Sequence, residues 1–308
     1  HLITSMNLAG CFLSSSNITA DASAVYLASG CTPTLFIVSR ASGHAVETVT
    51  LPSNADSVGV DATSIYVGLP DATVLTITKA SPHTTTSHAV GARWSGIFPR
   101  DGKLYASTFQ ARGAVTSARV FLAALNDGDV MREVDRATFA TTREYATALR
   151  EQTVAFDRTT GTFAGSVPNP FNSLGQMTGV HLRADESFLY QTMPGCCGIN
   201  VVIRDQLSLA QTGIIFRNFV DDVMRRGRFL FGGTEAGEVI AWDMQQPASP
   251  PVVSEVNLRT LTGHNGIEDI EIRGIWSDEH DDLVFAASSW GNDLSRGPDL
   301  PSFFILGF

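Results

Sequence analysis

One hydrophobic pattern recurs along the whole chain. A charged or glycine-containing turn is followed by a short apolar run with an aromatic residue near its centre, as in DASAVYLAS, DATSIYVG, DGKLYAS, DESFLYQT, GRFLFGG and DDLVFAAS. The aromatic positions are 39 to 54 residues apart, and the weakest copy is TTREYATA. They are Tyr26, Tyr66, Tyr105, Tyr145, Tyr190, Phe231 and Phe285. Shared turn-and-run contexts at a regular spacing indicate a repeated structural unit.

Each copy continues with a second apolar run that ends in a polar pair, as in TLFIVSR, TVLTITK, QTVAFDR, INVVIRD and EVIAWD. A turn and a further β-rich stretch such as HAVETVTL follow several of these runs. Alternation and β-branched residues predict strands, and the turn residues lie at hairpin distances. The segment MREVDRATFATTREYATALRE is also compatible with a helix, but Tyr145 falls inside it, so we interpret it as strands.

A repeat of about 40 residues with four strands predicts a β-propeller, in which the units stack radially around a channel. Seven aromatic positions predict seven blades in one all-β domain covering residues 1–308, with the count fixed to within one blade. The C-terminal PSFFILGF is expected to be the third strand of the seventh blade. The N-terminal HLITSMNL is expected to pair with it, which closes the ring and removes two open sheet edges.

Two repeats carry a family signature. RTLTGHNGIEDIEI followed by DDLVFAASSW resembles a WD repeat with its Gly263-His264 pair, and the preceding unit has Trp242-Asp243 in VIAWD. The earlier repeats, with IYVG and FDRTTG, are similar to YVTN and quinoprotein-type repeats. The resemblance implies a seven-bladed scaffold. It transfers no function, because these families include signalling platforms, lactonases, dehydrogenase subunits and lectin-like binders.

Composition narrows the classes of function. With 44% hydrophobic residues the chain can form a core, which excludes a disordered protein, and no apolar run reaches the ~18 residues of a membrane span. The net charge is −10 and the only lysines are Lys79 and Lys103, which disfavours nucleic acid as a partner. We therefore expect a protein or a glycan as the partner. The chain could also be a subunit of a larger assembly.

The four cysteines predict two disulfides. Cys11 and Cys31 lie equally far from a predicted turn at Asp21, so both thiols are expected at one end of a hairpin, where they could be bonded. Cys196 and Cys197 are expected in the corresponding loop of the fifth blade, which does not neighbour the first. A vicinal disulfide is the prediction there; two free thiols are the alternative.

Asn17-Ile18-Thr19 is a glycosylation sequon, and we expect it near an exposed turn. Together with oxidised cysteines it favours an extracellular or lumenal location. Reduced cysteines and an unmodified Asn17 would instead favour an intracellular WD-type scaffold.

The site candidates come from propeller geometry, since the sequence has no G-x-S-x-G, H-E-x-x-H, Walker or C-x-x-C motif. The starts of the inner strands and the loops after the second strands meet at one face. Residues predicted at that face are Arg93, Trp94, Gln176, Met177, Cys196, Cys197, Asp221, Asp222, Glu268 and Asp269. Such a ring could bind calcium, a sugar or a basic peptide, and the alternative is a water-filled mouth with solubilising charges.

The resulting expectation is a non-catalytic binding or structural module without a cofactor, catalytic residue or metal ligand. Trp94 and Trp290 are candidate contact aromatics. A second hypothesis is a lactonase-like propeller hydrolase that uses carboxylates at the channel mouth with a divalent metal. A third is the intracellular WD-type scaffold.

Overall fold

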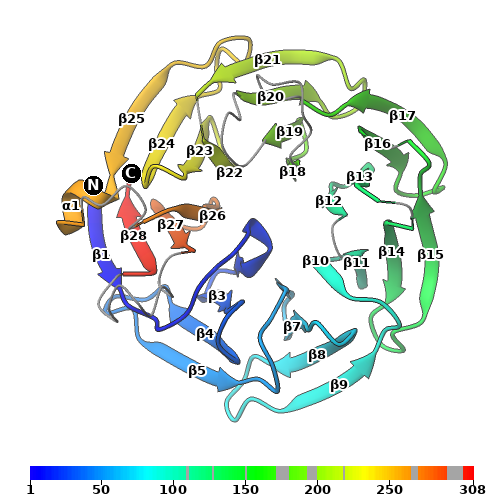
Figure 1. The fold of residues 1–308 in the computed structure, drawn as a ribbon, viewed down its shortest axis with the longest axis horizontal. Helices are drawn as coiled ribbons and strands as arrows, with labels where there is room; N and C mark the ends of the chain where they lie inside the picture. The colour runs from blue at the N-terminus through cyan, green and yellow to red at the C-terminus, as the bar shows by residue number, and fades with distance from the viewer. Residues whose placement is uncertain are drawn as a thin grey trace.

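Seven four-stranded antiparallel sheets form a ring around a central channel (Figure 1). The computed structural model describes residues 1–108, 111–126, 128–149, 151–170, 180–192, 200–217, 219–264, 270–289 and 301–308. This architecture confirms the all-β, seven-bladed propeller. None of the described helices is long and apolar enough to cross a membrane.

In every blade the first strand named lies at the channel and the last lies at the rim. Blade 1 has β2 (Ile18–Ala20), β3 (Ala24–Ala28), β4 (Thr34–Ser39) and β5 (Val46–Thr50), and blade 2 has β6 (Ser57–Val60), β7 (Ser64–Gly68), β8 (Thr73–Thr78) and β9 (Thr85–Ala89). Blade 3 has β10 (Trp94–Arg100), β11 (Lys103–Thr108), β14 (Val130–Asp135) and β15 (Thr141–Ala146). Blade 4 has β12 (Arg112–Val115), β13 (Arg119–Ala123), β16 (Gln152–Asp157) and β17 (Phe163–Pro168).

Blade 5 has β18 (His181–Ala184), β19 (Phe188–Thr192), β20 (Asn200–Asp205) and β21 (Gln211–Phe216). Blade 6 has β22 (Val220–Arg226), β23 (Phe229–Thr234), β24 (Glu238–Asp243) and β25 (Val252–Asn257). Blade 7 has β26 (Ile272–Trp276), β27 (Leu283–Ser288), β28 (Phe303–Gly307) and β1 (Leu2–Met6). The short helices are η1 (Ser15–Asn17) and α1 (Leu258–Thr262).

The ring closes as the sequence predicts. β1 pairs antiparallel with β28, with Thr4 opposite Ile305, so the two ends of the chain share blade 7 (Figure 1). The amino group of His1 adds a 2.8 Å hydrogen bond to the carbonyl oxygen of Gly307. β1 therefore pairs with a strand from the other end of the chain, and this pairing covers the outer edge of β28.

Blades 3 and 4 are interleaved in sequence. After β10 and β11 of blade 3 the chain forms β12 and β13 of blade 4, returns for β14 and β15, and then completes blade 4 with β16 and β17. The expectation that Tyr145 marks the fourth blade is therefore wrong, because Tyr145 lies in the outermost strand of blade 3. It is buried there, and its hydroxyl donates to Glu133 Oε2 at 3.1 Å. The second strand of blade 4 carries the buried Phe121 instead.

Neighbouring blades are also joined by ion pairs at their lower ends, opposite the face where the inner strands begin. The residue after a third strand reaches the first turn of the preceding blade. Arg136 binds Asp61 at 2.7 Å, and Arg40 binds Asp278 at 2.7 Å across the blade 1–blade 7 boundary. Lys79 binds Asp21 in the same way. These contacts explain the polar residues that end the second apolar run of several repeats.

Candidate functional site

The inner strands of all seven blades enclose a cavity of about 310 Å³ in the channel. Apolar side chains from every inner strand line it, namely Ile18, Val58, Val60, Ile97, Phe98, Pro99, Ala114, Val115, Leu182, Met224 and Trp276. Ser15 and Ser16 of η1 also line the cavity, together with Arg100, Arg112 and Arg183. The channel wall is thus mixed, with apolar groups somewhat more abundant than polar ones.

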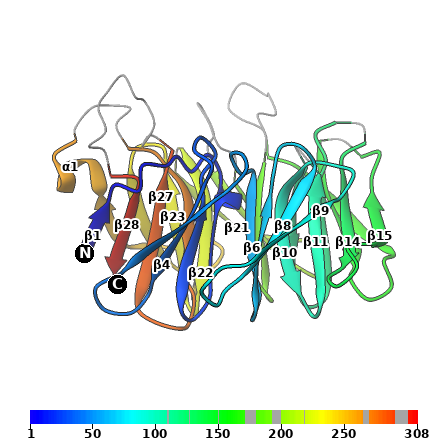
Figure 2. The same cartoon turned by 90° about the horizontal axis from the view of Figure 1, so that it is seen from below.

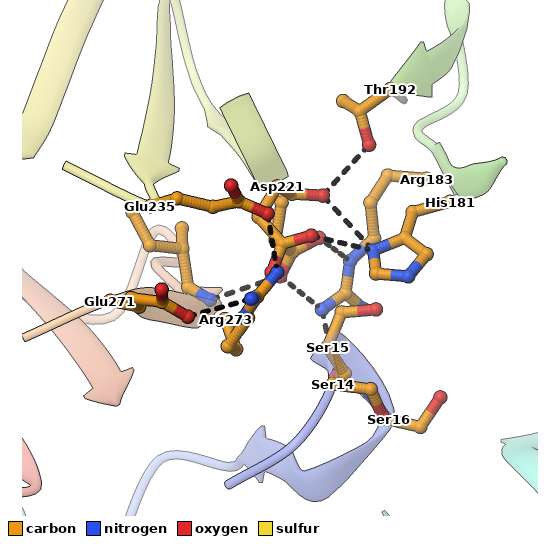
Figure 3. Close-up of polar contacts among 12 residues, drawn as sticks. Ser14, Ser15, Ser16, His181, Arg183, Thr192, Asp221, Glu235, Glu271 and Arg273 are labelled. Atoms are coloured by element: carbon orange, nitrogen blue, oxygen red, sulfur yellow. Dashed lines mark hydrogen bonds and ion pairs between the residues drawn. The ribbon is translucent and has the colours of Figure 1, made fainter. Parts of the chain in front are cut away.

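A polar cluster, buried in part, lies between blades 5, 6 and 7 (Figure 3). We call it the channel cluster and define it as His181, Arg183, Asp221, Asp222, Glu235, Glu271 and Arg273. Its core is a two-bonded ion pair in which Arg183 Nε and Nη2 donate to the two carboxylate oxygens of Asp222, each at 2.8 Å. The backbone amide of Ile275 also donates to Asp222 Oδ2 at 2.9 Å. One carboxylate therefore ties three neighbouring blades together.

Asp221 occupies the same cluster and is fully buried. Its Oδ2 accepts a 3.3 Å bond from Arg273 Nη1, while its Oδ1 has no hydrogen-bond partner within the described part of the chain. Its backbone oxygen accepts from His181 Nδ1 at 3.0 Å and from Thr192 Oγ1 at 2.8 Å. Burial raises the pKa of Asp221 to about 8 even though Arg273 opposes the shift, so the carboxyl is mostly protonated at neutral pH.

Burial acts on His181 in the opposite sense. It lowers the pKa of the imidazole to about 3, and the nearby guanidinium of Arg112 adds to the shift. His181 is therefore neutral at physiological pH. Arg273 completes the cluster by donating to Glu235 Oε1 at 2.7 Å and to Glu271 Oε2 at 2.6 Å. The carboxylates of this cluster are thus held by arginines in blades 5 and 7.

This placement changes the expected role of Asp221 and Asp222. The sequence predicts both near the start of an inner strand, and β22 does begin there, but neither side chain is exposed at an open mouth. Sequence reasoning missed their partners His181, Arg183 and Arg273. The available signal was the polar residues on the inner strands β18 and β26, which could only be matched to β22 once the ring order was known.

Arg93 and Trp94 lie in another part of the ring. Arg93 Nη2 donates to Asp56 Oδ1 at 2.6 Å, which links blade 3 to the loop before β6. Trp94 is only 2% exposed and packs against Tyr66 and Ile97, so it is a core residue instead of a contact platform. The remaining candidates, Cys196, Cys197, Glu268, Asp269, Gln176, Met177 and Trp290, lie outside the described residues.

The expected bond between Cys11 and Cys31 is present, with the Cα atoms 5.8 Å apart. It joins the segment before β2 to the loop after β3. The cysteines are not paired positions of the hairpin as the spacing suggested, because β2 and β3 pair Ile18 with Leu27. Among the residues that the structure describes, no three His, Cys, Asp or Glu side chains are grouped to hold a metal ion.

Asn17 is buried, which argues against the glycan expected from its sequon. The side chain is 2% exposed, and its Nδ2, the atom that would carry the sugar, donates to the carbonyl oxygen of Ala28 at 2.9 Å. Its Oδ1 accepts from the backbone amides of Leu13 and Ser14, both at 3.1 Å. The asparagine therefore anchors η1 beside the channel.

A second hollow lies at the rim between blades 5 and 6. This rim groove, of about 360 Å³, is lined by Phe216, Arg217, Phe219, Ala236 and Glu238. Phe216 ends the outermost strand β21 and is 77% exposed. Because strand direction alternates across a blade, this end belongs to the face at which the inner strands begin. That face, the upper face, is at the top of Figure 2.

Comparison with known proteins identifies the fold. No protein-family model and no curated protein matches the sequence. A chain in the mitotic checkpoint complex has a TM-score of 0.67 at 10% identity, covering 99% of this chain and 89% of that chain. The WD40 β-propeller domain of Doa1 has a TM-score of 0.66 at 11% identity, covering 99% of this chain and 96% of that chain. BamB from Moraxella catarrhalis has a TM-score of 0.58 at 12% identity, covering 100% of this chain and 97% of that chain. The chain is a propeller similar to the WD40 and BamB types.

Proposed function

We propose that this chain is a non-catalytic binding propeller, acting as an interaction or structural subunit that engages a protein partner through its upper face. The rim groove is the proposed contact. The observation that carries this proposal is Phe216, a large apolar side chain 77% exposed to solvent beside a hollow. Exposed aromatic residues with an adjoining pocket are typical of the anchors on which protein interfaces depend.

The chemistry around the groove defines the partner. Arg217 Nη2 donates to Glu238 Oε2 at 2.8 Å and to Glu255 Oε1 at 2.7 Å, so the groove has a charged border beside its aromatic residues. The whole chain carries a net charge of −10. We therefore assign the groove to a protein segment that presents an apolar side chain flanked by basic residues, since its positive charge would be attracted to an acidic protein.

The Cys11–Cys31 disulfide supports an extracellular or lumenal location for this interaction, because disulfides persist outside the reducing cytosol. The hydrolase hypothesis gains no support from Asp221 and Asp222, because both are fully buried and bonded to arginines of neighbouring blades. A carboxylate that acts on a substrate would have to be reached by it.

The test is the native mass of the protein extracted gently from its own source, followed by the same measurement on two variants. We expect a complex with a partner at fixed stoichiometry. Phe216→Asp should dissociate it, because the substitution puts a charge into the apolar contact. The matched control is Phe163→Asp, which changes a phenylalanine 58% exposed at the start of β17, on the opposite face.

Three results would overturn the proposal. One is a monomer of 33.0 kDa with no partner in the native extract. Another is a complex that survives Phe216→Asp or is lost equally with Phe163→Asp. The third is a glycan that binds the purified protein in a Phe216-dependent manner, which would make the groove a carbohydrate site.

A further inference from the structure

Within the described part of the chain, one charged side chain that lines the channel cavity has no counterion. Three arginines line it, and they are the only charged residues among the described lining residues. Arg183 is bound by Asp222, and Arg100 by Glu186 at 2.6 Å. Arg112 has no carboxylate within ion-pair distance in the described part of the chain. Its one hydrogen bond there is a long one, 3.4 Å, to the carbonyl oxygen of Ala111.

The surroundings of Arg112 make the lack of a counterion energetically unfavourable. It begins β12, and the cavity around it is walled by apolar groups such as Ile97, Leu182 and Met224. Burial lowers the pKa of Arg112 although the acidic residues Asp221 and Asp129 oppose the shift, and neither residue forms an ion pair with it in the described part of the chain. A half-buried guanidinium without a counterion is stabilised by an anion that binds beside it.

The size and the wall of the cavity limit which anions can bind there. A volume of about 310 Å³ equals that of about ten water molecules at ~30 Å³ each, so it fits a small molecule instead of a polymer. Its apolar groups, which make up somewhat more than half of the wall, can contact a hydrocarbon or aromatic body, and the hydroxyl groups of Ser15, Ser16 and Thr19 offer further donors. We propose that the channel binds a small amphipathic carboxylate, with the carboxylate on Arg112 and the apolar body against the inner strands.

This site is separate from the rim groove, so its test does not depend on the proposed protein partner. The probe is octanoate, a carboxylate with an eight-carbon apolar chain, and octanamide is its uncharged counterpart. Calorimetric titration of the wild-type protein should give a dissociation constant for octanoate below about 1 mM and binding at least tenfold weaker for octanamide.

The variant is Arg112→Met, which removes the charge but keeps an unbranched side chain. We expect it to weaken octanoate at least tenfold and to leave octanamide unchanged. Arg100→Met is the matched control, because Arg100 lines the same cavity but is already paired with Glu186. It should change octanoate binding less than threefold. Thermal melting of each variant establishes that it folds.

Several outcomes would overturn the proposal. They are no octanoate binding at millimolar concentration, equal affinity for octanoate and octanamide, and equal losses in the two arginine variants. If Arg112→Met does not fold, the octanoate–octanamide comparison on the wild-type protein decides whether the negative charge is needed. Arg112→Gln then takes the place of the methionine variant.

Discussion

The hydroxyl of Tyr66 donates a 2.7 Å hydrogen bond to Oδ2 of Asp61, five residues earlier in the same blade. The same oxygen accepts a 2.7 Å bond from Arg136 of the next blade. Blade 1 repeats the arrangement with Tyr26 and Asp21, and blade 5 repeats it with Tyr190 and Asp185. The repeated tyrosine is thus one part of a link that fixes the first turn of a blade and joins that turn to the following blade.

This link should be measurable by a double-mutant cycle. We expect Tyr66→Phe to lower the free energy of unfolding by about 1 kcal/mol, because it removes one hydrogen bond and leaves the ring in the core. Asp61→Ala should cost more, since it also frees Arg136 and removes the acceptor of the turn amides of Thr63 and Ser64. Urea denaturation of the two single variants and the double variant gives the coupling energy.

The coupling should be about 0.5–1.5 kcal/mol. A coupling energy near zero would mean that the tyrosine contributes only through its buried ring, and the hydrogen bond would then have no part in stabilising the turn.

The raised pKa of Asp221 predicts that stability falls as pH rises. The folded state keeps the proton up to a pKa of about 8, whereas the unfolded carboxyl loses it near its ordinary value of 3.8. The folded state therefore binds more protons between these values, and this group's contribution to stability declines as pH rises from about 4 to about 8. Asp221→Asn removes this titration and retains the backbone oxygen that binds His181 and Thr192.

We expect the melting temperature of Asp221→Asn to depend less steeply on pH between about 5 and 8 than that of the wild-type protein. Asp222→Ala is the contrasting variant, because it leaves Arg183 buried without its partner and should cost about 3–5 kcal/mol across the range. Parallel pH curves for wild type and Asp221→Asn would contradict the assignment of the proton to Asp221.

The Cys11–Cys31 disulfide should stabilise the fold by restricting the unfolded chain. The cysteines are 20 residues apart, and cross-linking a loop of this length removes about 3 kcal/mol of chain entropy from the unfolded state. We expect the double variant Cys11→Ser, Cys31→Ser to unfold at a correspondingly lower urea concentration. An unfolding midpoint of the double variant equal to that of the wild-type protein would contradict the expected contribution.

The architecture follows from the sequence because each repeat carries its own strand and turn pattern. Periodicity also located the ring closure, since HLITSMNL and PSFFILGF are incomplete blade pieces. It misplaced Tyr145 because Tyr145 follows Tyr105 by 40 residues and precedes Tyr190 by 45, a near-regular spacing that hides the exchange of strands between blades 3 and 4. Spacing along the chain does not report which sheet a strand joins.

The candidate site was harder to predict for a related reason. Asp222 is visible in the sequence, but its partner Arg183 is 39 residues away on another blade. Whether a carboxylate faces solvent or an arginine depends on the packing of three blades. The expectation that Asn17 lies near an exposed turn was wrong for a similar reason, because the hydrogen bonds that bury its amide come from backbone groups that a motif does not reveal.

The interleaving of blades 3 and 4 affects the order in which the blades can form during translation. It also restricts how blades could be lost or gained by deletion or duplication. During translation the outer half of blade 3, β14 and β15, is made only after the inner half of blade 4, β12 and β13. Blade 3 therefore cannot be completed on the ribosome before blade 4 has begun. For the same reason, a contiguous deletion or duplication cannot remove or add either blade alone, so residues 94–168 must be inherited as a pair of blades.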